Sequence, residues 1–130
     1  MSSSTETQLL ELNEKLLATI AAKDWNAYAD LCDSELTCFE PETLGHLVAG
    51  LQFHKYYFEL PPSTGVRNST LSAPRVRLLG NDAAVISYVR LIQYLDAGGI
   101  AQTAQFEETR VWERQSGKWK HVHFHRSSNA

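Results

Sequence analysis

Three arginines occupy positions at which predicted β-strands otherwise carry mostly apolar or aromatic side chains. Arg90, Arg110 and Arg126 lie on three successive stretches with this period-two pattern. Because strand side chains alternate between the two faces of a sheet, each arginine should point the same way as its apolar neighbours. A buried guanidinium keeps its charge and needs an acceptor. Convergence of the three on one concave interior would therefore form a cationic pocket for a carboxylate or a similar anion.

Carboxylates of the same chain are the alternative partners of these arginines. Glu108 and Glu40 could hold them in a structural network without any ligand. The ligand pocket is favoured because the three charges come from three successive strands, and ion pairing alone would not require all of them on apolar faces. His54 lies on the apolar side of a predicted helix, where it is either a satisfied core residue or, if it faces the cavity, a further donor to an anion.

Three histidines and two cysteines are candidate metal ligands. His121, His123 and His125 alternate on the final predicted strand, which predicts that all three share one face. Such spacing can bind a metal when a fourth ligand approaches, but no Cys or carboxylate accompanies it locally, so a packed or interface ladder is favoured. Cys32 and Cys38 match no zinc motif and are predicted to be buried thiols. We therefore expect no metal site, no cofactor and no catalytic residue.

Length and composition limit the function classes. The chain has 130 residues, which predicts a single domain over residues 1–130 with an ordered core of about residues 5–127. A net charge of -3 gives no basic excess for nucleic acid. No apolar run approaches the length of a membrane span, and the N-terminus lacks the features of a signal peptide. A reduced, cytoplasmic protein that binds neither nucleic acid nor membrane is the simplest expectation.

Three helical segments are predicted in the first half of the chain. Apolar residues at helical spacing follow Ser3 and Glu6, which can form a capping box at the start of the first helix. Asp24 is a plausible N-cap for a short second helix. The third helical stretch is expected over about residues 46–58, with His54 on its apolar side.

The second half of the chain changes to a strand pattern after the loop at residues 61–65. Short turns, each containing a glycine, separate the strands, which is typical of an antiparallel meander. Helices first and a long sheet second predict an α+β fold, in which helices pack on one face of a strongly curved antiparallel sheet and leave a conical cavity. The predicted strands cover about residues 35–39, 68–79, 83–96, 100–114 and 118–126.

The strand over residues 83–96 is also largely apolar on its other face. Val85, Val89, Leu91 and Leu95 dominate this outer face. A strand that is apolar on both faces needs cover on both, and the chain has too few helices to supply it. A second copy of the chain is the favoured cover, which predicts a homo-oligomer, a dimer at least. The alternative is that the N-terminal helix reaches round to this face.

Several runs of the sequence are similar to one known family. They are residues 38–45, 53–59, 88–91 and 117–119, with the more specific runs Glu107-Glu108-Thr109-Arg110-Val111-Trp112 and Val122-His123-Phe124-His125-Arg126-Ser127. Through them the chain resembles, from about residue 6 to residue 128, the association (hub) domain of calcium/calmodulin-dependent protein kinase II. That domain belongs to the NTF2-like, SnoaL-like superfamily.

The resemblance implies a cone-shaped NTF2-like (cystatin-like) fold and homo-oligomerisation into dimers or larger rings. It also implies an arginine-lined cavity for small carboxylates, because His54, Arg90, Arg110 and Arg126 fall on the pocket positions of the family. No kinase domain is visible in the sequence, so a freestanding, non-catalytic homologue is expected, with a separate kinase as a further candidate partner. The alternative is a small enzyme of the SnoaL or ketosteroid-isomerase type, which would use the same cavity and need a carboxylate or histidine base there.

Overall fold

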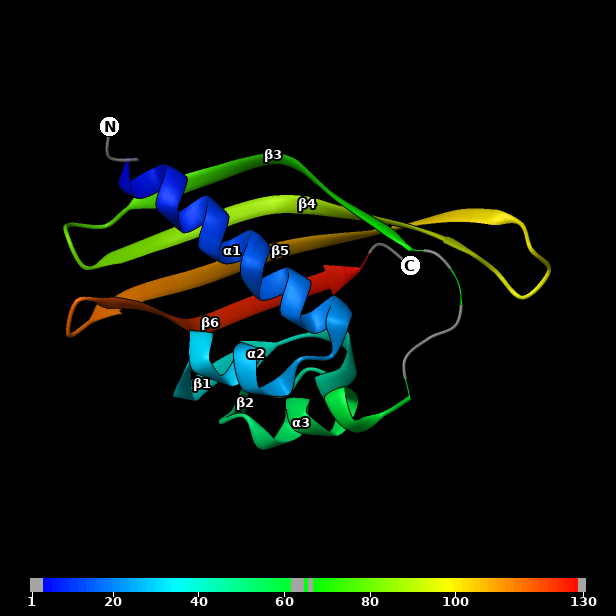
Figure 1. Cartoon of the computed structure of the whole chain (residues 1–130), viewed down its shortest axis with the longest axis horizontal. Coiled ribbons are helices and arrows are strands. Elements are labelled where there is room, and N and C mark those ends of the chain that lie inside the picture. Colours follow the sequence, from blue (N-terminus) through cyan, green and yellow to red (C-terminus); the bar gives the residue numbers. More distant parts are fainter. Residues whose placement is uncertain (1–3, 62–64, 66, 129–130) are drawn as a thin grey trace.

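Helices and one sheet make up the computed structural model, which describes residues 4–61, 65 and 67–128. The helices are α1 (Thr5–Ala22), α2 (Trp25–Leu31) and α3 (Gln52–Glu59), with a 3₁₀ turn η1 (Pro41–Thr43). Helix α1 lies across one face of the curved sheet, and α2 and α3 gather at one end of it (Figure 1). The arrangement confirms the predicted α+β fold with N-terminal helices on a curved sheet.

Six strands form the sheet, in the order β2-β1-β6-β5-β4-β3. They are β1 (Cys32–Phe39), β2 (Val48–Ala49), β3 (Asn68–Leu78), β4 (Ala83–Leu95), β5 (Ala101–Gln115) and β6 (Lys118–Ser128). Strands β3 to β6 form the predicted antiparallel meander, whereas β1 runs parallel to β6. The hairpin of β4 and β5 projects beyond the helices (Figure 1). The three arginine-bearing strands are therefore neighbours in the sheet.

Helix α1 is capped one residue away from the predicted position. Ser4 is the N-cap, and its Oγ accepts a hydrogen bond of 3.1 Å from the backbone N–H of Thr7. The predicted cap, Ser3, lies outside the described residues. At the other end, Lys23 adopts a left-handed backbone (φ 55°), and its N–H bonds the Ile20 carbonyl at 3.2 Å. Local capping thus sets both ends of the helix that lies over the sheet.

The third helix is shorter than predicted. The prediction included Val48–Ala49, but these residues form β2 and pair with β1, so that α3 begins only at Gln52. Gly50 separates the two elements, because its backbone has φ +86° and its N–H bonds the Leu36 carbonyl at 2.8 Å. This pairing is a long-range contact, which helical periodicity does not report. His54 still lies on the buried side of α3.

The prediction that the three histidines of β6 share one face is wrong. The register between β5 and β6 shifts, so that Trp112 lies opposite His121 but Val111 lies opposite His123. This β-bulge places one extra residue on β6 and reverses the alternation of side chains across it. His121 is therefore fully buried in the core, whereas His123 is half-buried and His125 is exposed.

The core lies between α1 and the inner face of the sheet. Asn13, in the middle of α1, hydrogen-bonds Tyr88 of β4 and Trp112 of β5, and both rings belong to the buried apolar cluster. The alternative in which the N-terminal helix covers the outer face is therefore wrong. The other buried members from α1, β1, β4 and β6 include Leu9, Leu16, Leu36, Ile86 and Phe124.

The outer face of β4 remains only partly covered by the described residues. Val85, Val89 and Leu91 are half-buried, and Leu95 near the tip of the hairpin is 57% exposed. The inner residues of the same strand, from Ala84 to Arg90, are buried. The strand is thus apolar on two faces, as predicted, and the chain covers one of them.

Candidate ligand-binding cavity

A cavity of about 220 Å³ lies between the helices and the inner face of the sheet. Its lining includes all four residues that the sequence predicted for the site, His54, Arg90, Arg110 and Arg126. Aromatic and aliphatic side chains complete the wall, among them Ile20, Tyr28, Tyr57, Phe58 and Phe124. The alternation argument therefore placed each arginine on the correct face.

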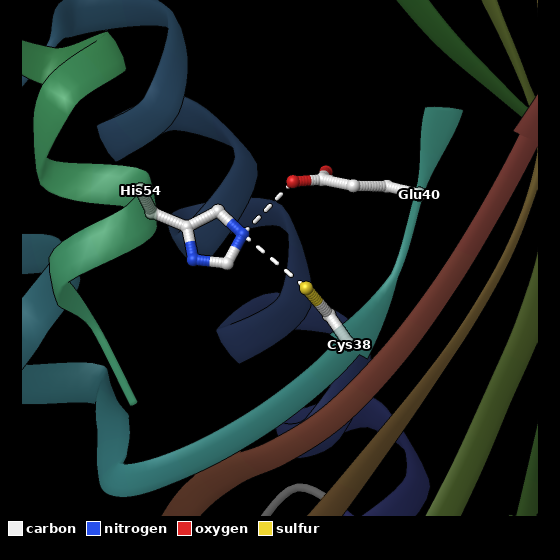
Figure 2. Close-up of side chains that lie close together, drawn as sticks. All are labelled: Cys38, Glu40 and His54. Carbon is white, nitrogen blue, oxygen red and sulfur yellow. Dashed lines mark hydrogen bonds and ion pairs between the residues drawn. The ribbon is translucent and has the colours of Figure 1, made fainter. Parts of the chain in front are cut away.

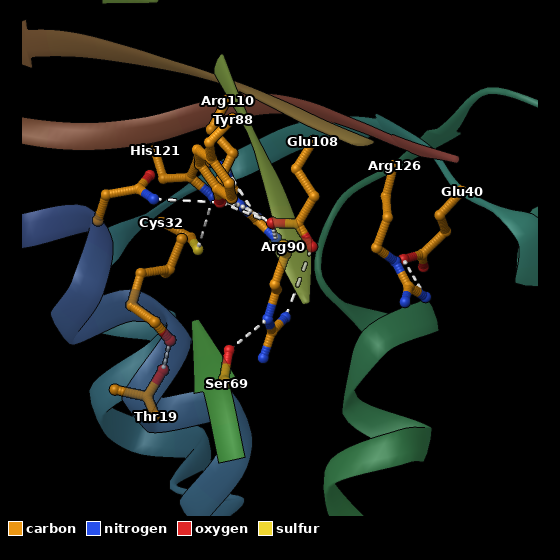
Figure 3. A network of polar contacts seen from close by, with 12 residues as sticks. Thr19, Cys32, Glu40, Ser69, Tyr88, Arg90, Glu108, Arg110, His121 and Arg126 are labelled. Carbon is orange, nitrogen blue, oxygen red and sulfur yellow. Dashed lines mark hydrogen bonds and ion pairs between the residues drawn. The ribbon is translucent and has the colours of Figure 1, made fainter. Parts of the chain in front are cut away.

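Glu108 is the centre of a buried group of ion pairs and hydrogen bonds (Figure 3). Its Oε1 lies 3.1 Å from Nη2 of Arg110 and accepts a hydrogen bond of 2.6 Å from the Tyr88 hydroxyl. Its Oε2 lies 3.5 Å from Nη1 of Arg90. We call Glu108, Arg90, Arg110 and Tyr88 the deep cluster. The side chain of Glu108 is 0% exposed and that of Arg110 is 2% exposed, so the pair is shielded from water.

The charges of the deep cluster support one another. Burial by itself would raise the pKa of Glu108, but Arg110, the Tyr88 hydroxyl and Arg90 together hold it below its usual value. Burial would likewise lower the pKa of Arg110, and Glu108 and the nearby tyrosines raise it above its usual value instead. Carboxylate and guanidinium therefore both stay ionised in the core.

Helix α1 and strand β6 complete the surroundings of Arg110. Its Nε donates to the Tyr88 hydroxyl at 3.1 Å, and that hydroxyl also accepts a hydrogen bond of 3.1 Å from Asn13. On the other side, Nη1 of Arg110 lies 3.4 Å from Nε2 of His121. Burial, with Arg110 as the second cause, holds the pKa of His121 well below its usual value. The imidazole is therefore neutral and accepts from the guanidinium at Nε2, with Nδ1 directed at Cys32 (3.6 Å to Sγ).

A second group of charges lies at the more exposed edge of the cavity. Nη2 of Arg126 donates to both carboxylate oxygens of Glu42, at 2.5 and 2.6 Å, and lies 3.6 Å from Oε2 of Glu40. The other oxygen of Glu40 lies 3.0 Å from Nε2 of His54. We call Arg126, Glu40, Glu42 and His54 the outer cluster. The Arg126 and Glu42 side chains are 17% and 35% exposed, respectively.

Every arginine of the cavity therefore has a carboxylate partner from the same chain. This is the alternative that the sequence left open, and it is present at Arg90, Arg110 and Arg126 while all three still line the cavity. The cavity is balanced in charge and is not the purely cationic pocket that alternation alone suggested. Glu42 was not foreseen as a partner, because it lies in η1, far along the chain from Arg126.

Both cysteines are free and buried, as predicted. Cys38 of β1 lies beside the outer cluster, with Sγ 3.4 Å from Nε2 of His54 (Figure 2). Burial, with the charge of Glu40 as the second cause, raises the pKa of the Cys38 thiol to about 12. Cys38, Glu40 and His54 offer three potential ligand atoms within 4.8 Å of one another, a set that the sequence analysis did not identify.

The fold is that of an NTF2-like protein. One such protein, an NTF2-like superfamily protein from Salmonella enterica, superposes with a TM-score of 0.75 over 95% of this chain and 90% of its own, at 22% sequence identity. That likeness supports the fold alone. No helix among residues 4–61 and 67–128 is long and apolar enough to cross a membrane.

The family is narrower than the fold. Residues 5–130 match the calcium/calmodulin dependent protein kinase II association domain, and the chain belongs to this family. The solved hub homology domain from Chlamydomonas is 48% identical, with a TM-score of 0.88 over 95% of this chain and 98% of its own. The Drosophila melanogaster calcium/calmodulin-dependent protein kinase type II alpha chain is 48% identical over 131 residues. That alignment takes 99% of this chain but only 25% of the kinase, so the chain spans about a quarter of the length of this curated relative.

Proposed function

We propose that the chain is a non-catalytic association domain that binds copies of itself through the outer face of its sheet. Membership of the association-domain family supports this function. The observation that carries it is the apolar outer face of β4, because Val85, Val89 and Leu91 are only half-buried by the described chain. Burying such a face removes apolar area from water, which drives association.

The test of self-association is a measurement of mass in solution by sedimentation equilibrium at micromolar concentration. We expect an oligomer for the natural sequence and a smaller species for the double variant Val89→Glu, Leu91→Glu. Leu79→Glu is the matched control, since Leu79 is a 50% exposed leucine at the turn between β3 and β4. A monomer of 14.6 kDa for the natural sequence would refute the proposal. An unchanged oligomer in the double variant would place the interface elsewhere.

The second part of the proposal is that the cavity binds a small carboxylate at the outer cluster. Arg126 has the most exposed side chain of the three arginines. The side chain of Glu42, its present partner, is 35% exposed. An incoming carboxylate can take the place of Glu42 while that side chain turns to water. Arg90 and Arg110, held by Glu108, would supply the positive inner wall.

Calorimetry with acetate, butyrate and succinate tests carboxylate binding. We expect Arg126→Gln to weaken the affinity by about 1.5–3 kcal/mol, the scale of a charge-assisted hydrogen bond. Arg75→Gln on the exposed part of β3 is the matched control and should change nothing. Absence of binding by the natural sequence at millimolar ligand would reject this part of the proposal and leave self-association untouched.

An isomerase-type activity in the same cavity is not favoured. A general base works best when its pKa is near the working pH. Glu40 and Glu42, the carboxylates that line the cavity, both lie against Arg126. Glu108, which is not among the lining residues, has a lowered pKa and is held by two arginines, which makes it a weak base. A kinase on a separate chain as a partner stays a prediction from the resemblance, and a location in the cytoplasm stays a prediction from the composition.

A further inference from the structure

We propose that Cys38, Glu40 and His54 form a binding site for a zinc-type divalent cation on the wall of the cavity. The three side chains point toward one another from two elements of the fold (Figure 2). Cys38 is in β1, Glu40 follows directly after it, and His54 comes from α3. The proposal does not depend on self-association, and it shares Glu40 and His54 with the outer cluster that we propose for carboxylate binding.

The distances between the donor atoms fit a four-coordinate metal. Nε2 of His54 lies 3.4 Å from Sγ of Cys38 and 3.0 Å from Oε1 of Glu40. All three donors lie within 4.8 Å of one another. Bonds of about 2.0 to 2.3 Å in a tetrahedral site place neighbouring donors about 3.3 to 3.8 Å apart. The two separations from His54 therefore need shifts of only a few tenths of an ångström, whereas the separation between Cys38 and Glu40, which is at most 4.8 Å, would shorten by up to about 1.3 Å.

The types of donor also suit zinc. A thiolate, an imidazole nitrogen and a carboxylate oxygen together form a mixed set that a borderline-soft cation accepts, whereas magnesium and calcium prefer oxygen alone. The donors are fixed by the fold, since Cys38 is paired within the sheet opposite Phe124 and Val48 and is fully buried. The side chains of His54 and Glu40 are 9% and 7% exposed.

In the absence of a cation, His54 cannot satisfy its neighbours. Its Nε2 is shared between Cys38 and Glu40, and a single N–H donates well to only one of them. Its buried Nδ1 has no hydrogen-bond partner among the described residues. No contact at Nδ1 therefore fixes which of the two ring nitrogens carries the proton. With the proton on Nδ1, the Nε2 lone pair is free for a cation, which contacts all three donors at once.

Charge does not prevent cation binding at this place. A Cys38 thiolate and the Glu40 carboxylate balance a doubly charged ion. Arg126 contacts the other Glu40 oxygen and has Glu42 as its own partner. Arg110, whose charge also acts on Cys38, is paired with Glu108. Binding breaks the S–H bond of Cys38, forms a sulfur–metal bond and releases the proton to solvent. Glu40 and His54 line the cavity, from which water could supply a fourth ligand.

The other cysteine–histidine pair of the chain is a natural control. Sγ of Cys32 lies 3.6 Å from Nδ1 of His121, a separation similar to that in the proposed site. The other nitrogen of His121 contacts Arg110, and no carboxylate joins this pair among the three-donor groups of the described chain. Cys32 and His121 therefore form a cysteine–histidine pair that lacks the third ligand of the proposed site, and we expect no metal to bind there.

Titration of the chelator-treated full chain with Co²⁺ tests the proposal, because a thiolate–cobalt bond gives a charge-transfer absorption band. We expect this band in the natural sequence and in Cys32→Ala, its loss in Cys38→Ser, and at least about tenfold weaker binding in His54→Gln. Added Zn²⁺ should displace the cobalt and remove the band. Circular dichroism of each variant verifies the fold, and Glu40→Gln, expected to weaken binding as well, replaces Cys38→Ser if that variant does not fold.

Three outcomes would overturn the metal site. One is the absence of a charge-transfer band in the natural sequence at micromolar protein and excess Co²⁺. The second is an unchanged band in folded Cys38→Ser, which would assign the thiolate to Cys32. The third is unchanged affinity in both His54→Gln and Glu40→Gln, which would mean that cobalt binds a single cysteine without the built site.

Discussion

Two groups of ion pairs lie on the wall of one cavity, and they differ in their access to water. In the deep cluster, Glu108 is 0% exposed and is held by Arg110, Arg90 and the Tyr88 hydroxyl. In the outer cluster, Arg126 and Glu42 meet at 2.5 Å but keep part of their surfaces in solvent. Both clusters pair arginine with glutamate, and their surroundings give these pairs different roles.

The difference teaches which arginines are structural. Removal of one partner from a buried pair leaves an uncompensated charge in the core, which costs far more than the pair gains. A partly exposed pair can open, because water solvates each partner when they separate. The deep cluster should therefore stabilise the fold, while the outer cluster can exchange partners with a ligand or, at Glu40, with a cation.

The largest expected effect is at the centre of the deep cluster. Glu108→Gln keeps the size of the side chain but removes its charge, so that Arg110 is left buried without a carboxylate. We expect a loss of about 3–5 kcal/mol in the free energy of unfolding, measured by urea denaturation at fixed protein concentration. Glu107→Gln, on the exposed side of the same strand, is the control and should have almost no effect. A loss below about 1 kcal/mol at Glu108 would remove the distinction between the clusters.

Asn13→Ala should give the next largest effect. The amide of Asn13 accepts from Nε1 of Trp112 at 3.1 Å and donates to the Tyr88 hydroxyl. Its removal leaves a buried indole N–H without an acceptor, for which we expect a loss of about 2 kcal/mol. Glu14→Ala, one position along on the exposed side of α1, controls for helix propensity. Equal losses in the two variants would mean that the link from α1 to the deep cluster contributes nothing.

Acidification should weaken the deep cluster through His121. The pKa of His121 is lowered in the folded state, so its stabilising contribution is present above the ordinary histidine pKa and is lost as the pH falls below it. Between pH 7 and pH 5 we expect the free energy of unfolding to fall by up to about 2 kcal/mol from this group. The variant His121→Gln should show a flatter dependence on pH, while replacement of the exposed His46 by Gln should not.

The smallest effect is expected at the outer cluster. Arg126→Gln removes the pair with Glu42, but Glu42 can turn to water and Glu40 keeps its contact with His54. The expected loss of stability in the absence of ligand is less than about 1 kcal/mol. Thermal unfolding with and without succinate measures this loss and the gain on ligand binding together. A loss as large as that of Glu108→Gln would make Arg126 a structural residue and count against its role in binding.

The alternation of side chains along single strands was enough to predict the inner-face positions of Arg90, Arg110 and Arg126. That rule depends only on the period of the backbone, and it holds wherever the strand is regular. It failed at His121, where a bulge adds one residue to β6 opposite the regular β5. Nothing in the local sequence of β6 reports the bulge, because it is a property of the pairing between two strands.

The predicted starts of one strand and one helix were wrong for the same reason. The strand predicted at residues 35–39 begins at Cys32, since β1 pairs in parallel with β6 at His121. The helix predicted from about residue 46 begins at Gln52, since Val48–Ala49 add a short strand to the edge of the sheet. Each shift comes from a contact between segments that are far apart in the sequence.

By itself, the sequence determined the α+β order, the arginines on the inner face and the apolar outer face of β4, because these follow from periodicities of a few residues. The runs of sequence that the chain shares with the association-domain family indicated that it belongs to this family. Only the tertiary structure decided which carboxylate meets which arginine, and that Cys38, Glu40 and His54 lie together. The packing of η1 and α3 against the strands determines these partners. The spacing of residues along the chain does not report which side chains are close in space.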